Sequence, residues 1–243
     1  MTKLTLLAAM LASCAAAQPP NIIRVIRNGS IQPYFDGKAA TNVLGMSSIA
    51  GFSETWLLEL HDSFASLEDL DKALSTVPQA PAPAALADGV LAPSKTLIAI
   101  YRPGLSYRPD QAVQNLPKMR YFDLVIYRVR PGTEADFAKL LKIRQFGLDS
   151  VNLDRPDIVY QVVSGEPDGT YVAITPLPSL RVLDDGRPVT PVYAEGEQAA
   201  ARKAAADTEL VREHLWFRIE PRTSYVSDEF ASADAGFWHP SAK

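Results

Sequence analysis

Glu59 and His61 are the residues whose types and spacing could perform acid–base chemistry. They end the run ETWLLELH, residues 54–61, which has the composition of a β-strand. Residues two apart in a strand point to the same side, so a carboxylate would lie beside an imidazole. Such a pair can take up and release a proton near neutral pH. The alternative is a solvated strand end without a chemical role.

Asp123 and Tyr127 form a second candidate pair in the strand predicted over residues 119–130. Alternation divides this strand into a mixed set, Tyr121, Asp123, Val125 and Tyr127, and an apolar set, Phe122, Leu124 and Ile126. The apolar set is expected to pack on helices, and the mixed set to line the space between two sheets. Glu59, His61, Asp123 and Tyr127 are therefore the candidate ligand-binding residues, and no catalytic residue is assigned.

Other site chemistries find little support in the sequence. His61, His214 and His239 lack the spacing of zinc or non-haem iron ligands. His214 is expected near the end of a helix, where it would interact with the helix dipole. No Gly-x-Ser-x-Gly elbow and no phosphate-binding loop occurs. We predict no metal site and no cofactor.

Length and charge narrow the class of protein. The 243 residues are 47% apolar, enough for the core of one large or two small domains. The formal net charge of −4 shows no basic excess, so we expect neither a nucleic-acid partner nor binding to an anionic membrane surface.

The N-terminus has the layout of a secretory signal. Lys3 precedes an apolar run over residues 4–12, and small residues follow. Cleavage after Ala17 would remove a signal peptide, residues 1–17, and release the protein into the periplasm or outside the cell. The alternative is a lipoprotein signal, residues 1–13, with a lipid anchor on Cys14. Since Cys14 is the only cysteine, we expect no disulfide in the mature domain. No other apolar run approaches about 18 residues, so we expect no integral membrane span.

The second half predicts a complete β-α-β-β-α-β unit over residues 119–226. After the first strand come a helix from Thr133 to about Leu148, a hairpin with its turn at residues 166–169, a helix over residues 195–214, and a strand from Leu215. This order is the ferredoxin-like arrangement.

The first half, residues 21–108, repeats this pattern with one element missing. Residues 22–29 resemble residues 125–132, and the hairpin strand places Trp56 over Tyr171. The second copy is longer before its hairpin by roughly 12 residues, about three helical turns. We infer that the first copy has lost its first helix and keeps only a connection, residues 30–41. Its second helix is expected to begin at Ser66 as the N-cap and to stop at Pro78.

The motif Pro-x-x-Ser-Tyr occurs once in each half, at residues 103–107 and 221–225. Both copies fall where the fourth strand should leave the sheet. We interpret the motif as a strand-exit device duplicated with the repeat, and a ligand-contacting loop is the alternative. A linker, residues 109–118, and a tail, residues 227–243, complete the organisation.

Three segments carry a resemblance to a known superfamily. They are LPKMRYFDLVIYRVRPG, YQVVSGEPDGTY and IAIYRPGLSYRPD. The chain resembles the dimeric α+β barrel superfamily, with its antibiotic-biosynthesis-monooxygenase-like, EthD-like and NIPSNAP-like members, and in particular a group of exported bacterial proteins. The resemblance implies an α+β fold in which two tandem ferredoxin-like repeats pair antiparallel sheets into one barrel. The missing helix would leave a sheet flank that another segment or a second protomer covers, which suggests a homodimer.

Three functions are compatible with these observations. The first is an exported module that is structural or binds a small apolar or aromatic ligand. The second is a cofactor-independent oxygenase or isomerase with acid–base side chains inside the barrel. The third is a haem-handling protein with His61 as the axial ligand. A closed pocket of ~300 Å³ or more that holds Glu59 and His61 would favour the second.

Overall fold

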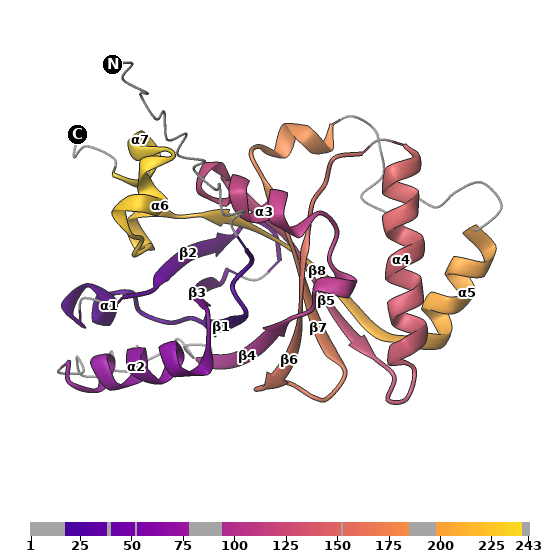
Figure 1. Ribbon diagram of the computed structural model, residues 1–243, viewed down its shortest axis with the longest axis horizontal. Coiled ribbons are helices and arrows are strands. Elements are labelled where there is room, and N and C mark those ends of the chain that lie inside the picture. The colour runs from indigo at the N-terminus through magenta and orange to yellow at the C-terminus, as the bar shows by residue number, and fades with distance from the viewer. Residues whose placement is uncertain are drawn as a thin grey trace, which may run out of the picture.

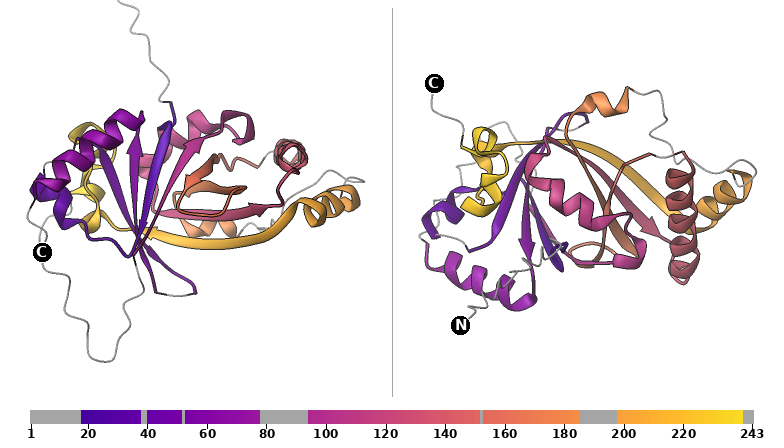
Figure 2. Two further views of the ribbon diagram at one scale, coloured as in Figure 1. Left: turned by 90° about the horizontal axis from the view of Figure 1, so that it is seen from below. Right: turned by 45° about the horizontal axis from the view of Figure 1, so that its top comes forward.

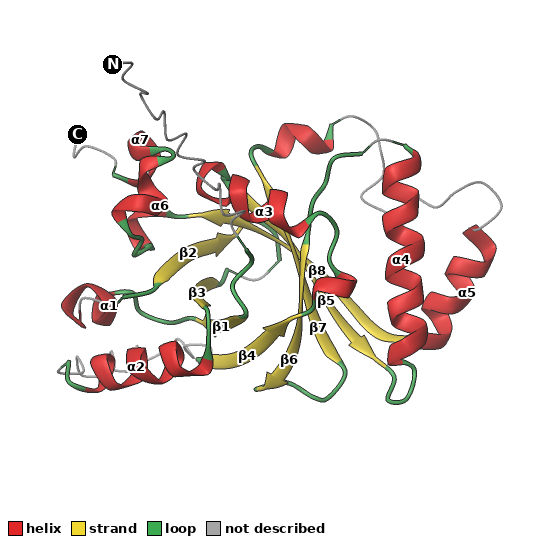
Figure 3. Cartoon of the chain, viewed as in Figure 1, coloured by secondary structure: helices red, strands yellow, loops and turns green. Residues whose placement is uncertain are grey.

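The chain forms a closed barrel of eight antiparallel strands with helices outside it (Figures 1 and 3). This computed structural model describes residues 18–37, 40–51, 53–77, 94–151, 153–184 and 198–239. The strands are β1 (Ile22–Arg27), β2 (Asn42–Ser48), β3 (Thr55–His61), β4 (Lys95–Tyr101), β5 (Tyr121–Val129), β6 (Ile158–Ser164), β7 (Thr170–Leu177) and β8 (Glu209–Ile219). The expected α+β class and antiparallel barrel are confirmed.

The helices form three groups around the barrel (Figures 1 and 2). The first group, α1 (Gln32–Gly37) and α2 (Phe64–Ser75), lies beside β1–β4, and the second group, α4 (Glu134–Ser150) and α5 (Gln198–Thr208), lies beside β5–β8. The third group, α3 (Pro109–Asn115), α6 (Asp228–Ser232) and α7 (Ala235–Trp238), lies at one end of the barrel. No helix in the described part of the chain is both long and apolar enough to cross a membrane.

The barrel consists of two four-stranded halves with the same strand order. The first half runs β4-β1-β3-β2, and the second runs β8-β5-β7-β6. If the strands of each half are numbered one to four along the chain, both halves have the spatial order four, one, three, two. The halves meet at two seams, where β2 pairs with β8 and β4 pairs with β6.

Apolar side chains from both halves fill the barrel. The buried cluster includes Ile23, Val25, Leu44, Met46, Trp56, Leu58, Phe122, Leu124, Ile126 and Phe217. The rings of Trp56 and Phe217 are 4.6 Å apart between centroids, so the two halves interlock in the interior. The prediction that Phe122, Leu124 and Ile126 pack on helices was wrong. In a closed barrel the interior is the most completely buried space, and it takes the purely apolar face.

The two Pro-x-x-Ser-Tyr motifs fasten the two seams in the same way. At one seam, Ser224 Oγ accepts a hydrogen bond from the Gly45 amide at 2.9 Å and donates to the Glu220 carbonyl at 2.8 Å. Tyr225 then exchanges both backbone hydrogen bonds with Val43. Each serine therefore satisfies a backbone amide of the opposite half.

The second motif repeats these contacts at the other seam. Ser106 Oγ accepts from the Val159 amide at 2.8 Å and donates to the Arg102 carbonyl at 3.0 Å. Tyr107 also forms a bridge, with Asp157, whose amide donates to the Tyr107 carbonyl at 2.8 Å. The Tyr107 amide, however, donates to the Asp157 carboxylate Oδ1 at 3.0 Å and not to a backbone carbonyl. Both prolines begin one turn of 3₁₀-helix, Pro103–Leu105 and Pro221–Thr223, which turns the chain back toward the seam.

The predicted connection over residues 30–41 contains a short helix, α1. Tyr34 from α1 and Leu70 from α2 pack on Val43 and Leu57 of the sheet. The first half therefore has a shortened first helix rather than none, and the sheet flank expected to be uncovered carries both helices.

Several element boundaries differ from the predictions. Helix α2 begins after Ser63, whose hydroxyl caps it, and Ser66 is the N3 residue of this capping box. Helix α5 ends at Thr208, so residues 209–214 extend β8 instead of the helix. The open edge of β5 gives these residues backbone partners, and pairing overrides their helical pattern. The linker contains α3, and Pro78, the expected helix stop, lies outside the described residues.

The proposed alignment of Trp56 with Tyr171 was also wrong. Trp56 belongs to the cluster inside the barrel, whereas Tyr171 belongs to the cluster beneath α4. Because alternate strand residues face opposite sides, an alignment that keeps the faces of the two strands matched has to differ from this one by an odd number of residues.

Candidate functional site

The four candidate residues lie outside the barrel, on two helix-facing surfaces. Glu59 and His61 lie on the outer face of β3, next to α1 and α2. Asp123 and Tyr127 lie on the outer face of β5, with α4 nearby. The structure brings Glu59 to His61 but does not bring this pair to Asp123 and Tyr127. The expected composite site inside the barrel was therefore wrong.

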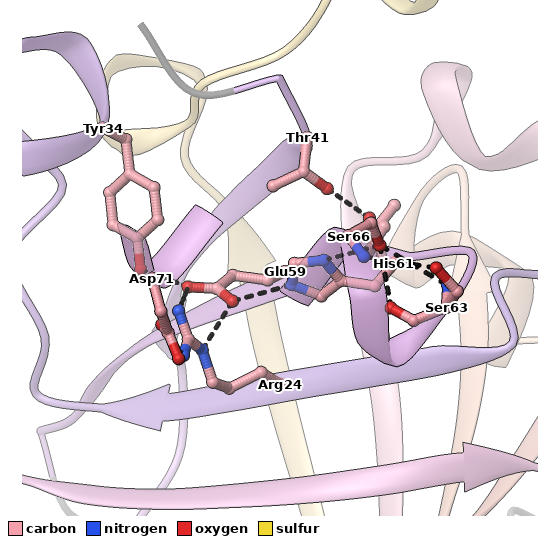
Figure 4. Close-up of polar contacts among 9 residues, drawn as sticks. Arg24, Tyr34, Thr41, Glu59, His61, Ser63, Ser66 and Asp71 are labelled. Carbon is pink, nitrogen blue, oxygen red and sulfur yellow. Dashed lines mark hydrogen bonds and ion pairs between the residues drawn. The ribbon is translucent and has the colours of Figure 1, made fainter. Parts of the chain in front are cut away.

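Glu59 is the centre of a buried polar cluster (Figure 4). Its Oε2 accepts from Arg24 Nε at 2.6 Å and lies 2.9 Å from His61 Nε2. Its Oε1 accepts from Arg24 Nη2 at 2.9 Å and from the Tyr34 hydroxyl at 2.5 Å. Four donors therefore surround one carboxylate, and Arg24 also reaches Asp71 of α2 at 2.5 Å.

Burial and hydrogen bonding act in opposite directions on this carboxylate. Glu59 is 0% exposed, and burial alone would raise its pKa. The hydrogen bonds from His61, Arg24 and Tyr34, with the Arg24 charge, outweigh burial and hold the pKa of Glu59 below its usual range. Burial, followed by the nearby Glu59 charge, raises the pKa of Tyr34. Glu59 is therefore ionised and Tyr34 is neutral at pH 7.

His61 is enclosed on both sides of its ring. Nε2 faces Glu59, and Nδ1 lies 3.4 Å from Ser66 Oγ, whose own proton goes to the Ser63 carbonyl at 2.9 Å. The side chain is 0% exposed, so the solvated strand end was also a wrong expectation. An axial haem ligand needs a free ring nitrogen, which His61 lacks in this arrangement. The cluster instead ties β3 to α1 through Tyr34 and to α2 through Ser66.

Sequence reasoning missed Arg24 and Tyr34, although a signal for Arg24 was present. In the ferredoxin-like order the first strand pairs with the third, and Arg24 lies directly opposite Glu59 in the register of β1 and β3. A basic residue at the centre of the first strand could therefore have been matched to the acidic residue of the third.

Asp123 is paired with a histidine that was expected elsewhere. Asp123 Oδ1 is hydrogen-bonded to His214 Nε2, and the side chains are 14% and 30% exposed. His214 lies on β8, so its expected place near a helix end was wrong. This pair remains open to solvent, unlike the Glu59 cluster.

Tyr127 is buried beneath α4. Its ring centroid is 5.2 Å from that of Phe137, and the Arg212 guanidinium lies over its other side at 5.6 Å. Burial raises the pKa of Tyr127. The tyrosine therefore serves packing in this structure.

Metal ligation has no assembled donor set in the part of the chain that the structure describes. No three His, Cys, Asp or Glu side chains there lie close enough together to hold an ion. Cys14 lies outside the described residues.

A cavity of about 410 Å³ lies at the end of the barrel, beside α3 and α6. Its apolar lining is Leu60, Val113, Leu116 and Phe230, and its polar lining includes Asn42, Asp62, Gln114 and Glu229. No Lys, Arg or His is among the described residues that line it. We call this cavity the barrel-end pocket.

A second cavity of about 380 Å³ lies beside the end of β7 and is lined by Met119, Leu153, Arg155 and Leu177, among others. Neither of these two cavities is lined by Glu59 or His61. These two cavities therefore do not support an acid–base enzyme that uses Glu59 and His61.

No protein-family model and no curated protein matches the chain. Among solved structures it is similar to a proposed monooxygenase from Lactobacillus acidophilus NCFM, with 8% identity, a TM-score of 0.49, and coverage of 87% of this chain and 100% of the other. An anthrone oxidase-like protein shows 9% identity, a TM-score of 0.47 and coverage of 83% and 92%.

A mutant chlorite dismutase from Candidatus Nitrospira defluvii shows 7% identity, a TM-score of 0.46, and coverage of 84% of this chain and 92% of the other. These similarities are too weak to carry an argument about activity.

Proposed function

We propose that the protein is a small-ligand-binding module whose ligand occupies the barrel-end pocket. The observation that carries this proposal is the cavity of about 410 Å³ with an apolar wall and several polar groups. Pockets for small molecules span roughly 300–1,000 Å³ and combine these two kinds of surface. The barrel interior is filled by its own side chains, so the ligand binds at the end of the barrel and not within it.

Charge narrows the class of ligand. Asp62 and Glu229 are the ionisable residues that line the pocket, and both are acidic. An anion would meet these charges without a cationic partner, whereas a neutral or positively charged molecule would not. Phe230 offers an aromatic surface for the apolar part of a ligand.

Binding can be tested with three probes that share one ring: benzylamine, benzyl alcohol and benzoate. Isothermal titration of the purified protein should give affinities in that order. Val113→Trp, which fills the pocket, should abolish binding, whereas Gln111→Trp, on the exposed side of the same helix, should leave it unchanged. The proposal fails if none of the probes binds saturably, or if Val113→Trp binds like the unchanged protein.

We also propose that the chain is exported and that its two halves arose by duplication of one unit. The apolar leader supports export, and the shared strand order with matching serine contacts at both seams supports duplication. Mass spectrometry of the N-terminus of protein recovered from the native host distinguishes cleavage after Ala17 from lipidation at Cys14. Light scattering tests the expected homodimer, whose basis in the sequence was a sheet flank that α1 and α2 in fact cover.

A further inference from the structure

The second cavity, of about 380 Å³, lies where three connections of the chain meet at the end of β7. Met119 precedes β5, Leu153 and Arg155 belong to the segment between α4 and β6, and Val182 belongs to the 3₁₀ turn after β7, Leu180–Leu183. We call this cavity the β7-end pocket. Its volume falls within the range of small-molecule sites.

The wall of the β7-end pocket is aliphatic. It consists of the side chains of Met119, Leu153, Leu177 and Val182 with three prolines, and the described residues that line it include no aromatic ring. Burial of hydrocarbon against such a wall is favourable, and a flexible chain can follow its shape. The apolar part of a matching ligand is therefore an alkyl chain.

Arg155 brings a positive charge to this wall. Its side chain is half-buried, and Nη2 donates to the Val182 carbonyl at 3.0 Å, which holds the guanidinium beside another lining residue. A guanidinium has five N–H donors, so one bond to a neutral carbonyl leaves most of them unused. Within the described part of the chain, no carboxylate forms an ion pair with Arg155. The pocket therefore offers unused, charged donors to a ligand.

The acidic residue beside Arg155 already has a partner. Asp154 Oδ1 lies 3.3 Å from Arg108 Nη1, and the Asp154 side chain is 71% exposed. A carboxylate that is solvated and paired repels an anion only weakly. Arg155 is therefore the dominant charge that a molecule in this pocket meets. The barrel-end pocket has the opposite character, because Asp62 and Glu229 line it.

We infer that the β7-end pocket is a second binding site and that it takes an alkyl carboxylate of the size of a medium-chain fatty acid. The ligand carboxylate accepts hydrogen bonds from the unused N–H groups of Arg155, in the paired geometry that a guanidinium favours. The alkyl chain lies against Met119, Leu153 and Leu177. This site does not depend on the ligand of the barrel-end pocket, and it selects the opposite charge.

The test uses octanoate, compared with 1-octanol, which has the same chain length and no charge. In a carbon-13 spectrum of protein labelled at its methionine methyl groups, the Met119 signal, assigned by its loss in Met119→Leu, should shift saturably with octanoate. Met46 lies inside the barrel, and its signal should not move. Octanol should bind about tenfold more weakly or worse, because it cannot form the charged hydrogen bonds with Arg155.

Three variants locate the binding. Arg155→Gln should weaken octanoate binding by about tenfold and leave octanol binding nearly unchanged, a difference that a general loss of packing would not produce. Val182→Trp, whose side chain fills the cavity, should abolish the binding of both probes. Arg181→Gln is the matched control: Arg181 is exposed, precedes Val182 and does not line the cavity, so octanoate affinity should be retained.

Val113→Trp, which fills the barrel-end pocket, should leave the Met119 shift intact, so either site can fail without the other. The inference is overturned if octanoate does not shift the Met119 signal of the unchanged protein, or if octanol binds with equal affinity. It is equally overturned if folded Arg155→Gln binds octanoate as tightly as the unchanged protein, or if Val113→Trp removes the shift.

Discussion

Replacing Glu59 by glutamine removes one charge from the buried cluster and leaves the side-chain size nearly unchanged. Both oxygens of the carboxylate accept hydrogen bonds. Oε2 accepts two of them, one from Arg24 and one from His61. A glutamine amide group placed there would present N–H groups to those same donors. We therefore expect Glu59→Gln to destabilise the fold strongly.

The magnitude follows from the contacts that are lost. A hydrogen bond to a charged group contributes about 1.5–3 kcal/mol, and two of these bonds lose their acceptor. Breaking a buried ion pair by removing one partner costs about 3–5 kcal/mol. Asp71 still pairs with Arg24, and its side chain is 58% exposed, so it compensates only in part. The two hydrogen bonds amount to about 3–6 kcal/mol and the ion pair to about 3–5 kcal/mol. We therefore expect the free energy of unfolding to fall by about 3–5 kcal/mol.

Urea-induced unfolding, followed by circular dichroism, measures this loss. Asp71→Asn is the control, because a largely exposed carboxylate should contribute at most about 1 kcal/mol. Adding Arg24→Met to Glu59→Gln should recover part of the stability, since no unpaired guanidinium then remains buried. A loss below about 1 kcal/mol for Glu59→Gln would refute the reasoning that this cluster holds α1 and α2 on the sheet.

Three further predictions concern stability and use the same urea assay. Ser106→Ala and Ser224→Ala should each cost about 1–3 kcal/mol, because each leaves a backbone amide at a seam without its acceptor; unequal losses would contradict matching roles. Gly45→Ala should cost about 1–3 kcal/mol or more, since a Cβ there would lie 2.0 Å from a backbone oxygen, whereas Gly104→Ala, with no atom within 4 Å, should change stability by less than about 0.5 kcal/mol. The lowered pKa of Glu59 stabilises the fold above the carboxyl pKa of the unfolded chain, and this contribution should be lost as the pH falls through the lower folded value; Glu59→Gln should lose less stability over that range, and an identical pH dependence would contradict the assignment.

The strand order was largely predictable from the sequence, and the faces of the strands were not. The aromatic and β-branched run that became β5 and the hairpin of β6 and β7 stand out because turns bound them. Alternation divides β5 into two faces but does not say which face is inside. Tyr127 and Asp123 look suited to a polar interior. The barrel interior instead contains Phe122 and Leu124, and the outer face of the strand carries the polar side chains.

The candidate site depended on pairings that sequence separation conceals. Glu59 and His61 are two residues apart, and their proximity was predicted. Arg24 and Tyr34 reach them from 35 and 25 residues away, through sheet register and a six-residue helix. His214 was assigned to a helix because residues 195–214 look helical, and only the backbone of β5 converts the end of that stretch into a strand.

The exchange of serine contacts across both seams makes the two halves mutually dependent for folding. In each half, a backbone amide of the second strand has its hydrogen-bond acceptor, a serine hydroxyl, in the other half. We therefore expect that neither half is soluble when it is produced alone. Fragments produced by cutting the chain just before α3 should instead reassemble when mixed. Two intact molecules could also trade halves and form a swapped dimer that keeps every seam contact.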